Sequence, residues 1–203
     1  MRTVGWGILG LGSIAHKFAT DLLLVKNTEL IAVASSDLER AKAFSEKFQA
    51  QNYYDTYESL FDDPQVEIIY IASLHPRHAE LSIAAMEKGK AVLCEKPLAM
   101  NQRQVEKMIA MAKSNEVFLM EGLWTRFNPS FSQAQEWISQ GELGKIKYIN
   151  ATFSFNGMNR GDDSRLFNPE KGGGTLLDIG IYPLFLAYQL LGMPKDIKAS
   201  AHL

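Results

Sequence analysis

The sequence predicts an α/β protein with a doubly wound parallel sheet, followed by an incomplete α+β domain with antiparallel strands. Short apolar runs alternate with helix-like stretches over residues 4–120, and this alternation calls for a parallel sheet with helices on both faces. A glycine-rich turn follows the first apolar run. The pattern then changes to long polar–apolar alternation, so we place the two domains at 1–122 and 123–203.

The first domain contains short runs that predict strands because each is apolar or β-prone and ends at polar or glycine residues. These strands are expected at residues 4–9, 30–34, 52–54, 66–72, 91–94 and 117–120. Helices are expected between them, at residues 13–25, 37–48, 56–61, 78–88 and 101–113. Residues 36–39, Ser-Asp-Leu-Glu, resemble a capping box that opens the second of these helices, Asn101 is a typical N-cap, and Gly89 is a typical C-cap.

The second domain begins with helical patterns and continues with strand-like ones. Helices are expected at 129–139 and from the triple glycine 172–174 to residue 191. Residues 145–155 and 195–203 alternate between apolar and polar side chains, which is typical of half-exposed antiparallel strands. Two strands do not form a stable sheet alone, so we expect this domain to be a fragment or to need a partner along its open edge.

Composition excludes several classes of protein. The 21 Lys and Arg balance 23 Asp and Glu, for a net charge of −2, which leaves no basic footprint for nucleic acid or for anionic membranes. A hydrophobic content of 46% excludes disorder as the main state. The single cysteine and the lack of a signal-peptide pattern predict a cytoplasmic protein. The apolar tract 179–193 is shorter than the ~20 residues that span a bilayer, so we expect a buried helix.

The glycine-rich turn is the first chemical motif. Residues 10–15, Gly-Leu-Gly-Ser-Ile-Ala, fit G-x-G-x-x-G/A between a strand and a helix, the Rossmann context for binding a pyrophosphate at a helix N-terminus. We therefore predict an NAD(P) site, with cofactor contacts from Gly10, Gly12, Ser13, Ile14 and Ala15. A tight turn that binds nothing and the glycine loop of a methyltransferase remain alternatives.

The end of the second strand should contact the adenosine ribose. Ser35, Ser36 and Arg40 could bind a 2′-phosphate through two hydroxyls and a guanidinium, so NADP is weakly preferred over NAD. Asp37 could instead accept a hydrogen bond from a free ribose hydroxyl. Ser36 and Asp37 are equally well explained as helix caps.

Three further stretches carry a family resemblance. They are Cys-Glu-Lys-Pro-Leu-Ala at 94–99, Glu-Gly-Leu-Trp-Thr-Arg-Phe-Asn-Pro at 121–129 and the triple-glycine segment 172–183. With residues 6–12 they resemble the Gfo/Idh/MocA oxidoreductases, especially the dihydrodiol and NADP-dependent xylose dehydrogenase branch. The resemblance implies a Rossmann domain followed by a domain with an open, largely antiparallel sheet, through which relatives form homo-oligomers.

Lys96 is the first catalytic candidate. It follows a parallel strand, at the sheet edge where doubly wound folds bind ligands, and could orient a substrate hydroxyl and help move its proton. A solvated surface lysine is the alternative from the residues alone, whereas the resemblance implies that Lys96 is catalytic and that Glu95 lies at the cofactor. A cis bond before Pro97 is plausible, and Cys94 is expected to be a buried strand residue.

Asp178 and Tyr182 are four residues apart on an expected helix, so they should share a face. Alternatively, Thr175 and Asp178 form a capping box, and Tyr182 is a packed aromatic. The resemblance implies active-site roles: Tyr182 as general acid/base, Lys96 assisting, and Asp178 positioning.

The resemblance also adds residues around these. Ser73, His75 and Arg165 are implied at the cofactor, while His78 is expected to cap or pack. Trp124, Arg126 and Phe155 are candidate walls of a substrate pocket, or else core residues. The spacing of His75, His78 and Cys94 matches no zinc pattern, so no metal is expected.

Together these observations predict an NAD(P)-dependent dehydrogenase or reductase that transfers a hydride between a nicotinamide cofactor and a hydroxyl-bearing carbon of a sugar or cyclic diol. The expected partner is a small polyol, with no nucleic acid and no membrane. A non-catalytic NAD(P)-binding module is the alternative.

Overall fold

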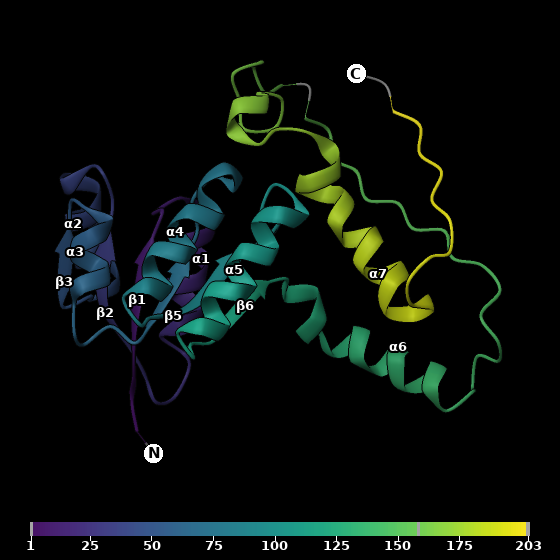
Figure 1. Cartoon of the computed structure of the whole chain (residues 1–203), viewed down its shortest axis with the longest axis horizontal. Coiled ribbons are helices and arrows are strands. Elements are labelled where there is room, and N and C mark those ends of the chain that lie inside the picture. Colours follow the sequence, from purple (N-terminus) through teal and green to yellow (C-terminus); the bar gives the residue numbers. More distant parts are fainter. Residues whose placement is uncertain (1, 158, 202–203) are drawn as a thin grey trace. The chain divides into compact units, whose positions relative to one another are not determined.

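The protein is described by a computed structural model that covers residues 2–157 and 159–201. The chain forms two compact units (Figure 1). The first unit is Met1–Gly122 together with Glu170–Gly172, and the second is Leu123–Pro169 together with Gly173–Leu203.

Within the described residues, the first unit holds a six-stranded sheet of order β3-β2-β1-β4-β5-β6, in which every pair is parallel. The strands are β1 (Val4–Leu9), β2 (Thr28–Ala34), β3 (Asn52–Tyr54), β4 (Ile68–Ile71), β5 (Ala91–Glu95) and β6 (Leu119–Gly122). The chain moves outward from β1 to β3 and then returns to the other side of β1 as β4. The predicted doubly wound sheet is therefore confirmed, with a topological switch point between β1 and β4.

Helices connect the strands, as the alternating pattern predicts. They are α1 (Ser13–Leu22), α2 (Leu38–Phe48), α3 (Tyr57–Asp62), α4 (His78–Glu87) and α5 (Gln102–Ser114), with a 3₁₀ turn η1 (His75–Arg77) before α4. Helix α1 ends three residues earlier than predicted. Leu24 and Val25 there form a turn that the Thr28 hydroxyl closes by donating to the Val25 carbonyl at 2.9 Å.

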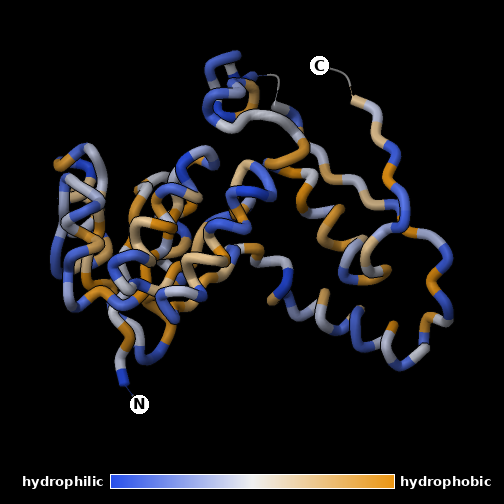
Figure 2. The backbone as a smooth tube through the Cα atoms, in the orientation of Figure 1, coloured by the Kyte–Doolittle hydropathy of each residue, from blue (hydrophilic) through white to orange (hydrophobic). Residues whose placement is uncertain are grey.

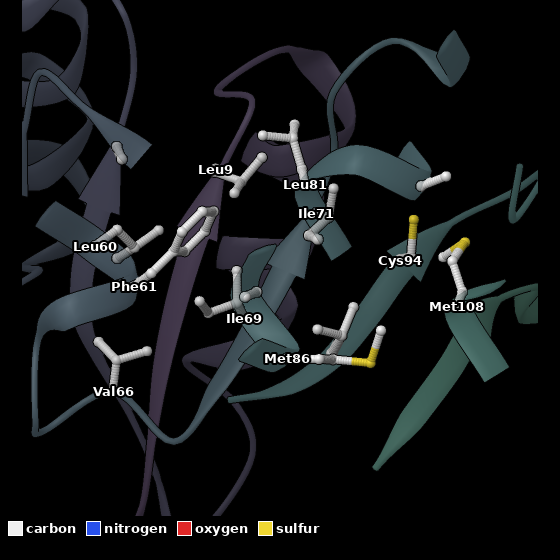
Figure 3. Packing of buried hydrophobic residues seen from close by; sticks show 14 of the residues in the cluster. Leu9, Leu60, Phe61, Val66, Ile69, Ile71, Leu81, Met86, Cys94 and Met108 are labelled. Atoms are coloured by element: carbon white, nitrogen blue, oxygen red, sulfur yellow. The ribbon is translucent and has the colours of Figure 1, made fainter. Parts of the chain in front are cut away.

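Two hydrophobic clusters cover the two faces of the sheet. Strand β4 shows the alternation that separates them: Ile69 and Ile71 point to the cluster formed with α3, α4 and α5, whereas Tyr70 points to the one formed with α1 and α2. Figure 3 shows part of the first cluster, with Ile69, Ile71 and Met86 packed together. Burying one such side chain contributes about 1.5–3 kcal/mol, so these clusters hold the sheet that positions the site.

The second unit is helical where it has regular structure. It contains the 3₁₀ turn η2 (Trp124–Phe127), helix α6 (Pro129–Ser139), the π-helical turn η4 (Leu176–Gly180) and helix α7 (Ile181–Leu191). A further 3₁₀ turn, η3 (Pro169–Lys171), lies where the chain passes between the two units.

The antiparallel strands predicted for this unit are wrong for the residues described. Residues 145–155 and 195–201 have no regular structure, and residues 202–203 lie outside the described part. A strand is stabilised by a neighbouring strand that pairs with its backbone. The described residues of this unit contain no strand that could pair with residues 145–155 or 195–201, so their alternating pattern does not form a sheet.

The expected burial of the apolar helix is also wrong. Within α7 only Phe185 is buried, although Figure 2 shows an apolar stretch along this helix. The helical turns of Pro169–Leu191 together form one segment of 23 residues that is long and apolar enough to cross a membrane by length and composition alone. A core helix of a soluble protein has the same properties, so this segment does not identify a membrane span.

Candidate cofactor and active site

The two glycines of the turn after β1 meet different surroundings. Gly10 has φ +79°, and a Cβ there would lie 2.5 Å from the backbone carbon of Ala72, so a side chain is excluded. A Cβ on Gly12 would meet nothing within 4 Å. The chain at Gly12 therefore faces open space in which a ligand can approach the backbone closely.

The N-terminus of α1 is arranged for an anion. Its N-cap, Gly12, has no capping side chain, and the first turn holds no acidic residue. The first N–H groups of a helix lack intrahelical partners and carry a partial positive charge. Ser13 and Ile14 are exposed there, while the buried Ala15 lets α1 pack closely on the sheet. This donor set fits a pyrophosphate.

A pocket of about 510 Å³ opens beside this turn, within the usual range for ligand sites. It lies at the carboxyl ends of β1, β2 and β4, where the switch point places ligands. Its lining residues are Gly10, Leu11, Gly12, Ser35, Ser36, Arg40, Tyr57, Ala72, Ser73, Leu74, Pro76, Arg77 and Glu170. The predicted residues Gly10, Gly12, Ser35, Ser36, Arg40 and Ser73 are thus brought together. His75 is buried and is not among the lining residues.

Three lining residues were not predicted from the sequence: Tyr57, Arg77 and Glu170. Arg77 lies in the same loop as the predicted Ser73, so its position after β4 is a signal that could have found it. Tyr57 directly follows the Thr56 N-cap of α3, at the carboxyl end of β3. Nothing local in the sequence places Glu170 beside the others.

The end of β2 keeps Arg40 available at the pocket. The Asp37 carboxylate caps α2 by accepting from the Arg40 N–H at 3.1 Å, and it lies 3.6 Å from the Arg40 guanidinium. The Ser35 hydroxyl accepts from the Asp37 N–H at 3.2 Å. Asp37 is therefore engaged as a cap, while the Arg40 side chain stays 60% exposed.

The turn that carries Lys96 is held on several sides. The Lys96–Pro97 bond is cis, as the sequence made plausible. The Glu95 carboxylate accepts from the Tyr70 hydroxyl and, at 3.2 Å, from the Lys96 N–H. Burial and the nearby Glu95 carboxylate raise the pKa of Tyr70, which keeps its hydroxyl protonated as a donor.

Two more side chains complete this support. The Leu98 N–H donates to the Glu121 carboxylate at 2.8 Å. The fully buried His78 ring lies with Nδ1 2.8 Å from the Pro97 carbonyl oxygen and Nε2 3.0 Å from that of Ser73. His78 packs as expected, and its ring also links the Lys96 turn to the loop that carries Ser73. The support that Tyr70 and Glu121 give this turn was not predicted from the sequence. For Tyr70, the available signal was a hydroxyl group within an otherwise apolar strand.

The second unit holds the other predicted residues. The buried Asp178 carboxylate, 5% exposed, accepts from the Arg165 guanidinium at 3.0 Å. Thr175 has helical backbone angles and no side-chain cap, so the capping-box alternative is wrong. Arg165, implied by the resemblance at the cofactor, thus lies in an ion pair that partly compensates a buried carboxylate.

Aromatic side chains surround Tyr182 in this unit. Its ring centroid lies 5.2 Å from that of Phe153 and 6.4 Å from that of Trp124. Phe155 helps line a pocket of about 230 Å³ together with Asn156, Gly157, Leu166, Phe167, Thr175, Asp178 and Ile179. Arg126 instead stacks on Phe185, with 5.2 Å between guanidinium and ring centroid.

No group of three or more His, Cys, Asp or Glu side chains that could hold a metal ion occurs among the residues the structure describes.

The sheet order, the glycine turn and the uncapped helix α1 define the first unit as a dinucleotide-binding Rossmann domain.

Comparison with known proteins identifies the family. The profile "Oxidoreductase family, NAD-binding Rossmann fold" matches residues 4–123, and the "GFO/IDH/MocA C-terminal domain" matches residues 131–203. The chain therefore belongs to the Gfo/Idh/MocA oxidoreductase family, as the motifs indicated.

Individual relatives agree with this assignment. Mouse (Mus musculus) trans-1,2-dihydrobenzene-1,2-diol dehydrogenase is 40% identical over 97% of this chain and 59% of its own length. The 3-ketoreductase KijD10 of Actinomadura kijaniata, in complex with NADP and TDP-benzene, is 31% identical with a TM-score of 0.88, over 94% of this chain and 58% of its own. Aldose-aldose oxidoreductase of Caulobacter crescentus, complexed with glycerol, is 29% identical with a TM-score of 0.81, again over 94% and 58%. The chain thus spans about three fifths of the length of these relatives.

Proposed function

We propose that this protein is an NAD(P)-dependent oxidoreductase acting on a hydroxyl-bearing carbon of a sugar or cyclic diol. The observation that carries the proposal is the uncapped N-terminus of α1, which follows the Gly10–Gly12 turn beside a pocket of about 510 Å³. Relatives named as a diol dehydrogenase, a ketoreductase and an aldose oxidoreductase support the substrate class.

We propose NADP as the preferred cofactor. The supporting observations are the exposed Arg40 guanidinium and the Ser35 and Ser36 residues at the end of β2. A guanidinium binds a phosphate dianion more strongly than a free hydroxyl. Asp37, the residue that could favour NAD, is already used as the cap of α2.

The chemistry divides between the cofactor and the protein. A bound nicotinamide supplies the hydride acceptor or donor. In the oxidising direction the substrate hydroxyl must also lose its proton. The Tyr182 phenolate accepts this proton, and the phenol so formed returns it in the reverse direction. Lys96 orients the same hydroxyl through its ammonium group, and Asp178 positions the substrate by accepting a hydrogen bond.

The first experiment is a titration of the chain with NADPH and with NADH, followed by tryptophan quenching and energy transfer to the nicotinamide. We expect both to bind and NADPH to bind more tightly. No binding by a sample with a cooperative thermal transition would contradict the cofactor proposal.

A matched pair of variants makes this test specific. Gly12→Val should abolish binding and leave the thermal midpoint unchanged, because the added side chain points into open space where the pyrophosphate must approach. Gly161→Val, in the second unit, changes a glycine that also faces open space but is not part of the pocket, and it should leave binding intact. Equal binding by Gly12→Val and the wild type would contradict the assigned pyrophosphate position.

The catalytic roles are tested separately from binding. Lys96→Met and Tyr182→Phe should each retain NADPH binding and lower turnover of a sugar or cyclic diol by about 10²–10⁴-fold, the usual contribution of a positioned acid or base. Steady-state kinetics beside the binding titration provide the measurement. Unchanged turnover in either variant would refute the role of that residue, and wild-type binding without any turnover would favour the non-catalytic module.

A further inference from the structure

Two residues in the wall of the cofactor pocket have no role in any motif described above. Arg77 ends the turn η1 before α4, and Tyr57 is the first residue of α3. Both line the pocket that contains the Gly10–Gly12 turn and the end of β2. Their side chains therefore face the space in which the adenosine half of a dinucleotide is expected.

The Arg77 guanidinium is held in a defined position. Its carbon lies 5.4 Å from the centroid of the Tyr57 ring, within the range of a cation–π contact. One of its nitrogens lies 3.3 Å from the Glu80 carboxylate, and the side chain is 50% exposed. The Tyr57 ring thus backs the guanidinium and Glu80 holds one of its nitrogens, while half of the side chain stays exposed and the residue lines the pocket.

Arg77 and Arg40 differ in the groups that surround them. Arg40 lies at the end of β2 with Ser35 and Ser36, where hydroxyl groups and a cation suit the ribose phosphate. Both guanidinium groups have a carboxylate neighbour, Asp37 for Arg40 and Glu80 for Arg77, but Arg77 is also backed by the Tyr57 ring. A planar, weakly hydrated guanidinium in such a setting is suited to stacking on a flat ring.

We propose that Arg77, backed by Tyr57, is the stacking platform for the adenine base of the dinucleotide, and that it contributes equally to NADPH and NADH. Arg40, in contrast, distinguishes the two cofactors. The proposal rests on the proposed cofactor function and adds the residue that binds the base. Stacking of a base on a planar side chain is tolerant of the groups carried elsewhere on the ligand.

The test compares the dissociation constants of NADPH, NADH and adenosine 5′-monophosphate for the full chain and its variants. Arg77→Ala should weaken all three by about the same factor, near tenfold, which corresponds to about 1.4 kcal/mol. Arg40→Ala should weaken NADPH alone. Ligand-induced shifts of the thermal midpoint give an independent readout that needs no turnover.

Three further variants separate stacking from charge and from folding. Arg77→Lys keeps the charge but loses the planar group, so it should weaken binding nearly as much as Arg77→Ala. Tyr57→Phe keeps the backing ring and should bind normally, whereas Tyr57→Leu should weaken all three ligands. Arg103→Ala, an exposed arginine of α5, is the control and should have no effect.

The outcomes distinguish the stacking proposal from the proposed cofactor function on which it rests. Failure of the wild type to bind either dinucleotide would overturn the cofactor function and the platform together. Normal wild-type binding with an unaffected Arg77→Ala variant would overturn the platform alone. A loss confined to NADPH would also overturn it, because Arg77 would then contact the 2′-phosphate.

Discussion

At the scale of single residues, the turn around Lys96 is supported by side chains from three other places in the chain. Tyr70 reaches Glu95 from β4, Glu121 reaches Leu98 from β6, and His78 contacts Pro97 from α4. The role proposed for Lys96, orienting a substrate hydroxyl, requires such support, because small displacements of a catalytic group cost much of its effect. Under that proposal these hydrogen bonds position Lys96 and also stabilise the turn.

Removing one of these supports should have a measurable cost. Tyr70→Phe deletes the hydroxyl that donates to Glu95, and an unsatisfied, partly buried acceptor costs about 1–3 kcal/mol. We expect the free energy of unfolding in urea to fall by about that amount. Tyr53→Phe, which removes an exposed hydroxyl on the edge strand β3, should change it by less than about 0.5 kcal/mol. Equal effects of the two substitutions would show that the Tyr70–Glu95 bond does not support the turn.

Cys94 gives a pH-dependent prediction at the same scale. Burial raises the pKa of its thiol from 9.0 to about 12, so the folded state disfavours the thiolate that the unfolded chain forms. Stability from this group is fully present below pH 9 and is lost as the pH rises from 9 toward about 12. Urea unfolding at several pH values should show a shallower decline between pH 9 and 11 for Cys94→Ala than for the wild type. Parallel declines would contradict a buried, neutral thiol.

At the scale of elements, the helices of the first unit differ at their N-termini. Asp37, Thr56 and Asn101 cap α2, α3 and α5 by accepting a backbone N–H, whereas α1 has no side-chain cap. Helix α4 also lacks a side-chain cap, but the turn η1 leads directly into it, whereas α1 follows the Gly10–Gly12 turn beside the pocket. A side-chain cap satisfies one of the free N–H groups of a helix, so the uncapped α1 leaves these donors open for the proposed anion.

This difference predicts separate effects on stability and binding. Asn101→Ala removes the cap of α5 and should lower the free energy of unfolding by about 1 kcal/mol, with unchanged NADPH affinity, because α5 does not line the pocket. Urea unfolding and the binding titration measure the two quantities on one sample. A loss of affinity without a loss of stability would contradict this division.

At the scale of the whole molecule, the two units differ in their cores. The first has two clusters that cover both faces of its sheet. In the second, Leu123, Asp178 and Phe185 are the buried residues among those the structure describes, apart from glycine. Local stability follows buried apolar contacts and protected backbone hydrogen bonds, so the units should not be equally resistant to opening.

Hydrogen exchange measures this difference directly. Amides of β1 and β4 should exchange slowest, and those of α6 and α7 should exchange faster by orders of magnitude. NADPH should add protection in the first unit, around the Gly10–Gly12 turn. Amides of α7 as slow as those of β4 would contradict a weakly packed second unit.

The sequence by itself determined the features that depend on neighbours along the chain. Strand periodicity, the Asn101 cap and the Gly10–Gly12 turn are local patterns, so the parallel sheet and its candidate anion-binding helix could be predicted. The capping box expected at residues 36–39 is found as a cap by Asp37. The family motifs likewise pointed to Lys96 and Asp178 because each motif is a short contiguous stretch.

Only the tertiary structure decided what depends on distant segments meeting. The Tyr70–Glu95 and Leu98–Glu121 bonds join residues 25 and 23 positions apart, and the Arg77–Tyr57 stack joins two different strand–helix connections. The strand predicted at 145–155 is wrong for the same reason. A strand requires a partner elsewhere in the chain, and a stack requires a shared sheet edge, whereas a cap or a glycine turn requires only the residues beside it.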